Sequence, residues 1–461
     1  MRISPISVLN IYNNNNYAAR NNSKPFITAP LGFDSVSFTG VHAGGMPLKK
    51  LAAYGIPDMY TGKTLLDPKV LESLLQRNVF DKPISKLTPI ISKYQDTLLP
   101  VEKTILELVT TLAKKQPDIK LYEALKTLAQ EHQKKLLKIQ QPVFEHLIQK
   151  ACDLPQNLYK DFWDLMNITN KRLSKEPVII PFNENDFIYK LQRVATVIKA
   201  KNIHKETLAI NNLIKEAKLV FAVEEENHIK FGRGKKGRQR KIEYQMRPAV
   251  LKQNVIRLRY LEEIFSKSVF KNNKDLQQIF HQTSARIHGF PAVIPFKRKE
   301  FVHELKEITK RIEDKDFAAE IIKTARQLPK STENISAFIV KYASDTNNKI
   351  GYFMMHPGVC SIDHLDAKIN GGKNKLFNFG LCGAHVNSQK TNIPFDEWVR
   401  MHPETRINCQ KHVDRLIELY NDGTFNKVGL ERKYITDFAE QIEKLSPKEE
   451  PLILDISKLN K

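Results

Sequence analysis

The sequence has few cysteines, no long apolar run and fewer acidic than basic residues. Only four cysteines occur in 461 residues, too few for a disulfide-stapled secreted scaffold, so a reducing, cytoplasmic environment is expected. No window approaches the roughly 18 uninterrupted apolar residues of a membrane-spanning helix. Arg2 is not followed by the apolar core of a standard signal peptide. We therefore expect a protein with no membrane partner.

Positive charge is in excess. The chain has 73 Lys and Arg against 51 Asp and Glu, a formal net charge of +22 at pH 7. Such a charge favours nucleic acid as a partner. The alternative is a Lys-rich background composition with no polyanionic partner. With 41% hydrophobic residues the chain can bury a sizeable core, and its length allows two or three domains of about 100–200 residues each.

The first two regions differ in their patterning. Residues 1–45 contain asparagine runs and no apolar periodicity, which is typical of a disordered N-terminal segment. Across residues 46–343 apolar side chains recur at helical spacing, so a helical region is expected. Pro117 and Pro142 are interpreted as breaks between its helices.

The helical region contains an apparent internal duplication. The segment PVIIPF at 177–182 recurs as PAVIPF at 291–296. A phenylalanine and a leucine follow each copy at matching distances: Phe187 and Leu191, then Phe301 and Leu305. The pattern predicts one helical unit present twice, at about 155–220 and 269–330, each opened by a rigid Pro-x-x-x-Pro segment. Coincidence in a helical protein is the alternative.

A basic segment at 230–241 separates the two copies. Three glycines give it flexibility. The cations predicted to contact nucleic acid are Arg233, Lys235, Lys236, Arg238, Arg240 and Lys241. A basic loop of this kind can follow a phosphate backbone, which predicts contact with nucleic acid. The alternative is a solvated linker.

Residues 344–461 have a different pattern. The apolar run at 352–355 is predicted as a strand. Two short extended segments, 358–365 and 377–385, flank a Gly-Gly turn. A helix is predicted to begin near Asn387, where asparagine also suits an N-cap, and further helices follow it.

The residues in and after these extended segments suit hydrolysis of a phosphodiester with one metal ion. His364 is a candidate general base near neutral pH. Asp363 and Asn387 offer the oxygen ligands that hard cations such as Mg²⁺ prefer, although another divalent metal is an alternative. His385 is a reserve ligand if Asn387 points away. Lys390, one helical turn after Asn387, is expected to reach a phosphate.

Asp363 and His364 are neighbours, and neighbouring residues of a strand point to opposite faces. Both can therefore serve one site only near a bend or a strand end. The loop that follows them in the sequence is compatible with a strand end at this point.

The stretch resembles the HNH endonuclease motif, which forms a ββα-metal finger. Gly371 and Gly372 match the Gly-Gly turn of that family, Asn378 its middle asparagine and Asn387 its final His-or-Asn position. The positions fit without a gap. The resemblance covers about 352–398, and no family is recognised for the rest of the chain.

The resemblance implies roles for these residues. His364 would be the general base. Asn378 would also belong to the catalytic residues, because it would shape the loop and help to hold His364 in place. Asp363 and Asn387 would bind one divalent metal, and Lys390 matches a common lysine of the family. The family cuts DNA, and less often RNA.

Many members of the family also carry two Cys-x-x-Cys pairs that bind a structural zinc. In this sequence the spacing departs from that pattern. The nearest candidates for a zinc site are Cys360, Cys382, Cys409 and His412. The alternative is buried cysteines and a surface histidine.

We therefore expect a mostly α-helical protein with a small C-terminal ββα-metal (HNH-like) finger in residues 344–461. The expected function is metal-dependent hydrolysis of nucleic acid, with DNA favoured. One alternative is a nucleic-acid-binding protein that uses the finger as a scaffold without catalysis. Another is a nuclease toxin delivered by its N-terminal regions.

Overall fold

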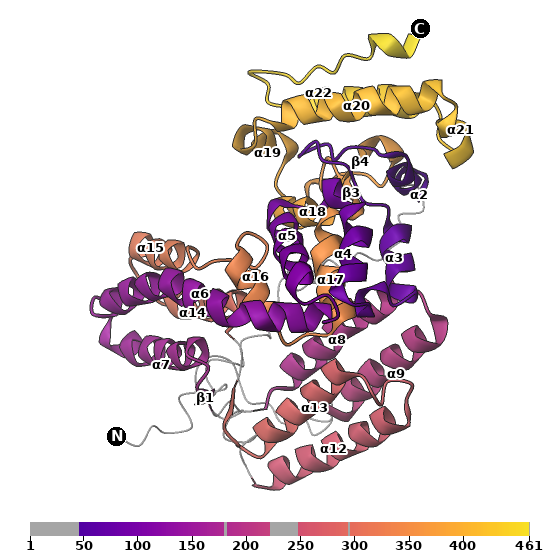
Figure 1. The fold of residues 1–461 in the computed structure, drawn as a ribbon. Helices are drawn as coiled ribbons and strands as arrows, with labels where there is room; N and C mark the ends of the chain where they lie inside the picture. Colours follow the sequence, from indigo (N-terminus) through magenta and orange to yellow (C-terminus); the bar gives the residue numbers. More distant parts are fainter. Residues whose placement is uncertain (1–45, 179–181, 222–247, 294–295, 461) are drawn as a thin grey trace. The chain divides into compact units, whose positions relative to one another are not determined.

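The computed structural model describes residues 46–178, 182–221, 248–293 and 296–460 (Figure 1). The predicted disordered segment 1–45 lies outside the described residues. So does the basic segment 230–241, and with it Arg233, Lys235, Lys236, Arg238, Arg240 and Lys241. The described residues form 19 α-helices and two antiparallel two-stranded sheets, which confirms the prediction of a mostly helical protein. None of these helices is long and apolar enough to cross a bilayer.

The chain divides into two compact units. One is formed by the described part of Tyr122–Thr346, and the other joins residues 46–121 to residues 347–460. Residues 46–121 were expected to belong to the helical region. In the structure Leu51 and Ile56 from that stretch share a core with Trp398 of the C-terminal part. This stretch therefore packs with the C-terminal part because of its buried apolar side chains, although it is distant in the sequence.

The unit that contains the C-terminus is built from short helices around one small sheet. Its helices are α2 (Met46–Lys49), α3 (Pro68–Gln76), α4 (Ile84–Ser92), α5 (Pro100–Lys115), α17 (Asn347–Met355), α18 (Ala384–Lys390), α19 (Phe395–Met401), α20 (Thr405–Asn421), α21 (Thr424–Val428) and α22 (Lys433–Leu445). Its strands are β3 (Cys360–His364) and β4 (Phe379–Gly383).

The other unit holds longer helices and a second small sheet. Its helices are α6 (Leu121–Ala151), α7 (Gln156–Leu173), α8 (Glu184–Ala200), α9 (His204–Phe221), α12 (Pro248–Lys267), α13 (Lys274–Ile287), α14 (Arg298–Thr309), α15 (Lys315–Ala325) and α16 (Ile335–Tyr342). Its strands are β1 (Pro177–Val178) and β2 (Ala292–Val293).

Two expectations about local structure are wrong. The residues at 352–355 are the last turn of α17, where all four side chains are buried; a helix that is apolar on every side cannot be distinguished from a buried strand by periodicity alone. Pro142 lies inside α6 and does not end it. The following turns continue the helix because they bury Phe144 and Leu147 in a core, which offsets the cost of an interior proline.

The two repeats exchange helices. Each has the element order helix, strand, helix, helix: α7, β1, α8 and α9 in the first, and α13, β2, α14 and α15 in the second. One core is formed by α6 and α7 with α14 and α15, and the other by α12 and α13 with α8 and α9 (Figure 1). The equivalent residues Phe187 and Phe301 lie in different cores. Each core thus combines the first helix of one repeat with the last two helices of the other, and α6 or α12, which precedes that first helix, completes it.

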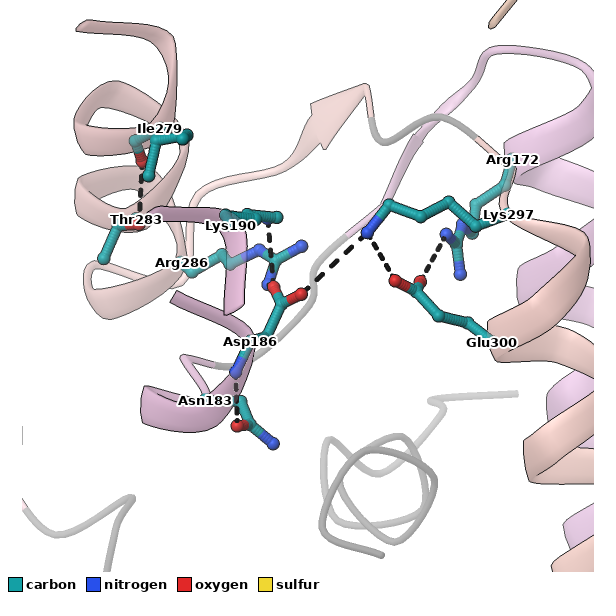
Figure 2. Close-up of polar contacts among 9 residues, drawn as sticks. All are labelled: Arg172, Asn183, Asp186, Lys190, Ile279, Thr283, Arg286, Lys297 and Glu300. Carbon is teal, nitrogen blue, oxygen red and sulfur yellow. Dashed lines mark hydrogen bonds and ion pairs between the residues drawn. The ribbon is translucent and has the colours of Figure 1, made fainter. Parts of the chain in front are cut away.

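Reciprocal ion pairs hold this crossing together. The recurring Pro-x-x-x-Pro segments pair antiparallel, with Val178 opposite Ala292. Arg172, at the end of α7, lies 3.3 Å from Glu300 of α14. Its counterpart Arg286, at the end of α13, pairs with Asp186 of α8 (Figure 2). Such reciprocity is what a two-fold axis between equal partners produces.

Lysines join the two pairs into one network. Lys297 pairs with Glu300 and also lies 3.9 Å from Asp186, and Lys190 lies 3.0 Å from Asp186 (Figure 2). Burial opposes ionisation of Asp186, but Lys190, Lys297 and Arg286 together hold its pKa well below the ordinary range. The carboxylate therefore stays charged at the point where the repeats cross.

In the C-terminal unit, Glu102 in the first turn of α5 is a buried acid. Its side chain is 1% exposed. Burial raises the pKa of its carboxyl to about 7, against opposing effects from a backbone hydrogen bond and from Lys63. The folded protein therefore binds this proton more tightly than the unfolded chain does.

The stability of this unit should fall as the pH rises from about 4.5 to about 7, by at most about 1.4 kcal/mol per pH unit from this group. The stabilisation from neutral Glu102 is fully present below the pKa that this carboxyl has in the unfolded chain. It is lost as the pH rises through the higher pKa of the folded protein. Glu102→Gln keeps the neutral shape, so the variant should equal the parent at pH 4 and unfold at a higher temperature at pH 8. The exposed Glu107 of the same helix gives the control, Glu107→Gln. Equal melting temperatures of Glu102→Gln and parent at pH 8 would contradict this account.

Candidate functional site

The candidate site is built on β3, β4 and α18, which follow one another in the order strand, strand, helix. The strands pair antiparallel from Cys360 opposite Gly383 to His364 opposite Phe379. Both predicted extended segments are confirmed, and β3 ends at His364. The helix begins at Ala384, directly after β4. Asn387 is therefore inside α18 and is not its N-cap, in contrast to the expected helix start.

Asp363 is held by two donors on one oxygen. The carboxylate is 4% exposed. Its Oδ2 accepts a hydrogen bond from the Tyr60 hydroxyl at 2.5 Å and lies 3.0 Å from Nζ of Lys390. Burial and the charge of Asp363 raise the pKa of Tyr60 well above its ordinary value, so the phenol keeps its proton and donates it. Oδ1 takes part in neither contact.

Lys390 does not fit the predicted role of a phosphate contact. Its side chain is fully buried, at 0% exposure. Besides pairing with Asp363, its ammonium donates to the main-chain oxygen of His364 at 3.2 Å. Lys390 stands three residues after Asn387, on the same helix face, and that face packs on β3. The cation therefore neutralises the candidate metal ligand.

His364 is partly exposed at the end of β3. Its Nε2 lies 2.8 Å from Oδ1 of Asn374, and its ring packs edge-on against Phe379 with 4.8 Å between centroids. An amide oxygen only accepts hydrogen bonds. With Asn374 in this orientation Nε2 carries the proton, and Nδ1 is the basic nitrogen of the ring.

Asn378 fixes the loop between the two strands. The side chain is 1% exposed. Its amide nitrogen donates to the carbonyl oxygens of Asp366 and Lys373 at 2.9 and 3.0 Å, and its oxygen accepts from the Asp366 amide at 2.9 Å. These bonds hold together the two ends of the loop from Asp366 to Lys373. Asn374, the hydrogen-bond partner of His364, directly follows that loop. Asn378 thus acts on the histidine through the loop.

Asn387 is oriented by the strand that α18 covers. Its Nδ2 donates to Ser361 Oγ at 2.7 Å and to the Ile362 carbonyl oxygen at 3.1 Å. Ser361 and Asp363 are two residues apart on β3 and so point to the same face. Both bonds use the nitrogen, so the amide oxygen is directed away from them. The structure thus brings Asn387 and Asp363 to one face of β3.

This donor set fits a hard divalent cation. Oδ1 of Asp363 and Oδ1 of Asn387 are one carboxylate and one amide oxygen, and Mg²⁺ is commonly bound by one or two carboxylates with several retained waters. Across the described ranges, no group of three or more His, Cys, Asp or Glu side chains is arranged for a metal. A site made of one Asp and one Asn is a smaller set of ligands than such a group. The reserve ligand His385 lies on α18 near His356, whose pKa is lowered to about 4 by burial and, to a smaller extent, by His385.

The four zinc candidates lie in the apolar core of this unit. Cys360 and Cys382 are buried on the paired strands, and burial raises the pKa of the Cys360 thiol to about 12. Cys409 donates to the Met59 carbonyl oxygen at 3.3 Å. Burial lowers the pKa of His412 to about 4, and its Nδ1 lies 2.6 Å from a main-chain oxygen. The cysteines are buried as the alternative expected, and the histidine is buried as well.

Three residues at this site could not be predicted from the sequence. Tyr60 is 303 positions from Asp363. Asp58, in the same short segment, accepts a hydrogen bond from the Gly383 amide at 2.8 Å, where β4 meets α18. Asn374 is one polar residue among several in a loop. Only the path of the chain places these side chains beside the motif.

The chain was compared with protein-family models, with curated proteins and with solved structures, and nothing in any of the three matches it.

Proposed function

We propose that β3, β4 and α18 form an HNH-like ββα-metal finger and that the chain is a metal-dependent endonuclease that hydrolyses phosphodiester bonds, with DNA as the favoured substrate. The observation that carries the proposal is the placement of Asp363 and Asn387 on one face of β3, next in the sequence to His364, the last residue of that strand. The net charge of +22 supports a polyanionic substrate.

The proposed roles follow from the contacts. Asp363 and Asn387 would hold one divalent cation through their Oδ1 atoms. Such a cation, when bound, stabilises the charge that develops on the phosphate and the leaving oxygen. His364 takes the proton of the attacking water at Nδ1, and Asn374 keeps the imidazole in the tautomer that allows this. Lys390 and Tyr60 hold Asp363 in place through its Oδ2.

One observation favours the alternative of a non-catalytic nucleic-acid-binding protein. Asp363 already has a lysine ammonium 3.0 Å away, so part of its charge is compensated before any cation arrives. A binding protein would show affinity that falls steeply with salt and needs no divalent metal.

The test is incubation of the full chain with supercoiled plasmid and Mg²⁺, Mn²⁺, Ni²⁺ or Zn²⁺. Metal-dependent nicking or linearisation that EDTA abolishes is expected. Tight, salt-sensitive binding without cleavage of DNA or RNA under any of these metals would replace the proposal with the binding protein.

A further inference from the structure

We propose that Tyr60 is a positioning residue for the metal site, and that the segment from Pro57 to Thr61 completes a finger whose ligands come from the far C-terminal part of the chain. The Tyr60 hydroxyl, together with Lys390, fixes Asp363 Oδ2 so that Oδ1 is held toward the cation. This inference rests on the proposed function, because it concerns the same metal.

Tyr60 is itself held rigidly. Its side chain is 2% exposed, and its ring packs edge-on against Trp398 with 5.6 Å between centroids. Its main-chain nitrogen donates to Asp58 Oδ1 at 2.7 Å, and its main-chain oxygen accepts from Asn408 Nδ2 at 2.7 Å. Because its ring and its backbone are both held by these contacts, the position of the Tyr60 hydroxyl beside Asp363 is fixed.

Lys390 alone would not give the carboxylate a direction. An ammonium on a flexible stem acts as a point charge with rotatable donors. A carboxylate turns about its last carbon–carbon bond unless a directed hydrogen bond holds one oxygen. The phenol of Tyr60 supplies that bond at 2.5 Å. Two donors on the same oxygen then set where the other oxygen of Asp363 points.

The same segment also governs the second ligand. Asp58 Oδ2 accepts from the Gly383 amide, immediately before α18 begins. Asn387 projects from that helix. Residues 58 and 60 therefore fix both elements that present metal ligands, β3 through Asp363 and α18 through Gly383, the residue that precedes it. Partners of metal ligands in other proteins act in this way, by orienting the ligands before the metal arrives.

The test compares Tyr60→Phe with Tyr434→Phe in the full chain. Phenylalanine keeps the packed ring and removes only the hydroxyl. Tyr434 is a matched control because it is buried in the same core, and its hydroxyl donates a hydrogen bond at 3.0 Å to the Phe379 carbonyl oxygen and not to Asp363. Mn²⁺ binding is measured by electron paramagnetic resonance without substrate, and cleavage is measured as a function of Mn²⁺.

Tyr60→Phe should weaken Mn²⁺ binding roughly 10-fold, a usual loss for a partner of a metal ligand, and should shift cleavage to higher Mn²⁺ by the same factor. Tyr434→Phe should match the parent. If Tyr60→Phe binds Mn²⁺ as the parent does, or if both variants lose affinity equally, the positioning role is wrong. A parent that binds Mn²⁺ and cuts nothing overturns the nuclease alone, because the comparison of the variants still stands. A parent that binds no Mn²⁺ overturns both.

Discussion

Replacing His364 with alanine is expected to lower the rate of plasmid cleavage by roughly 10²–10⁴-fold, the usual contribution of a general base. The fold should be unaffected, because the side chain is partly exposed at the end of β3. Binding of DNA should also persist, since contacts with the phosphate backbone do not require the general base His364.

The control is His402→Ala in the same unit. His402 is partly exposed, as His364 is, and lies 3.4 Å from Glu404, with its ring against Trp398. Its variant should cut at the parental rate. Initial rates at saturating Mn²⁺, with circular dichroism and DNA binding on the same samples, give the comparison. Parental cleavage by His364→Ala would show that the base lies elsewhere.

Arg286→Ala should produce the largest loss of stability, about 3 kcal/mol in the unit that contains the repeats. This is the lower end of the range for breaking a buried pair, because Lys190 and Lys297 still face Asp186. Hydrogen exchange of the full chain measures the effect without requiring two-state unfolding. Peptides from α8 and α13 should exchange roughly 100-fold faster, since each 1.4 kcal/mol is a factor of ten.

Two further variants make this comparison specific. Arg172→Ala removes the reciprocal pair with Glu300 and should accelerate exchange in α7 and α14. Arg311 pairs with Asp161 at 2.7 Å, but its side chain is 38% exposed, so Arg311→Ala should cost less than about 1 kcal/mol. If Arg286→Ala and Arg311→Ala exchange alike, the network does not hold the crossing.

Local features of the candidate site could be predicted from the sequence. Alternation around a Gly-Gly turn located both strands, and polar residue types located Asp363, His364 and Asn387. The direction of Lys390 could not be predicted, because helical spacing gives neighbours on α18 but does not say which face covers β3. Tyr60 could not be predicted either, since nothing in its own segment identifies a partner 303 residues away.

The repeats show the same limit at the scale of the fold. Similar segments at 177–182 and 291–296 indicate two alike helical units. They do not indicate whether each unit closes on itself or exchanges helices with the other, because the same apolar faces satisfy both arrangements. The ion pairs that decide for the exchange, Arg172 with Glu300 and Arg286 with Asp186, join one repeat to the other and are visible only in the structure.

The exchange of helices has a consequence for synthesis on the ribosome. Domains generally fold as they emerge, N-terminal parts first. When α9 has been made, the nascent chain carries half of each core and the whole of neither, because α6 and α7 await α14 and α15 while α8 and α9 await α12 and α13. The apolar faces of the first repeat therefore stay exposed until the second repeat leaves the exit tunnel. During that interval chaperones can bind these exposed apolar faces.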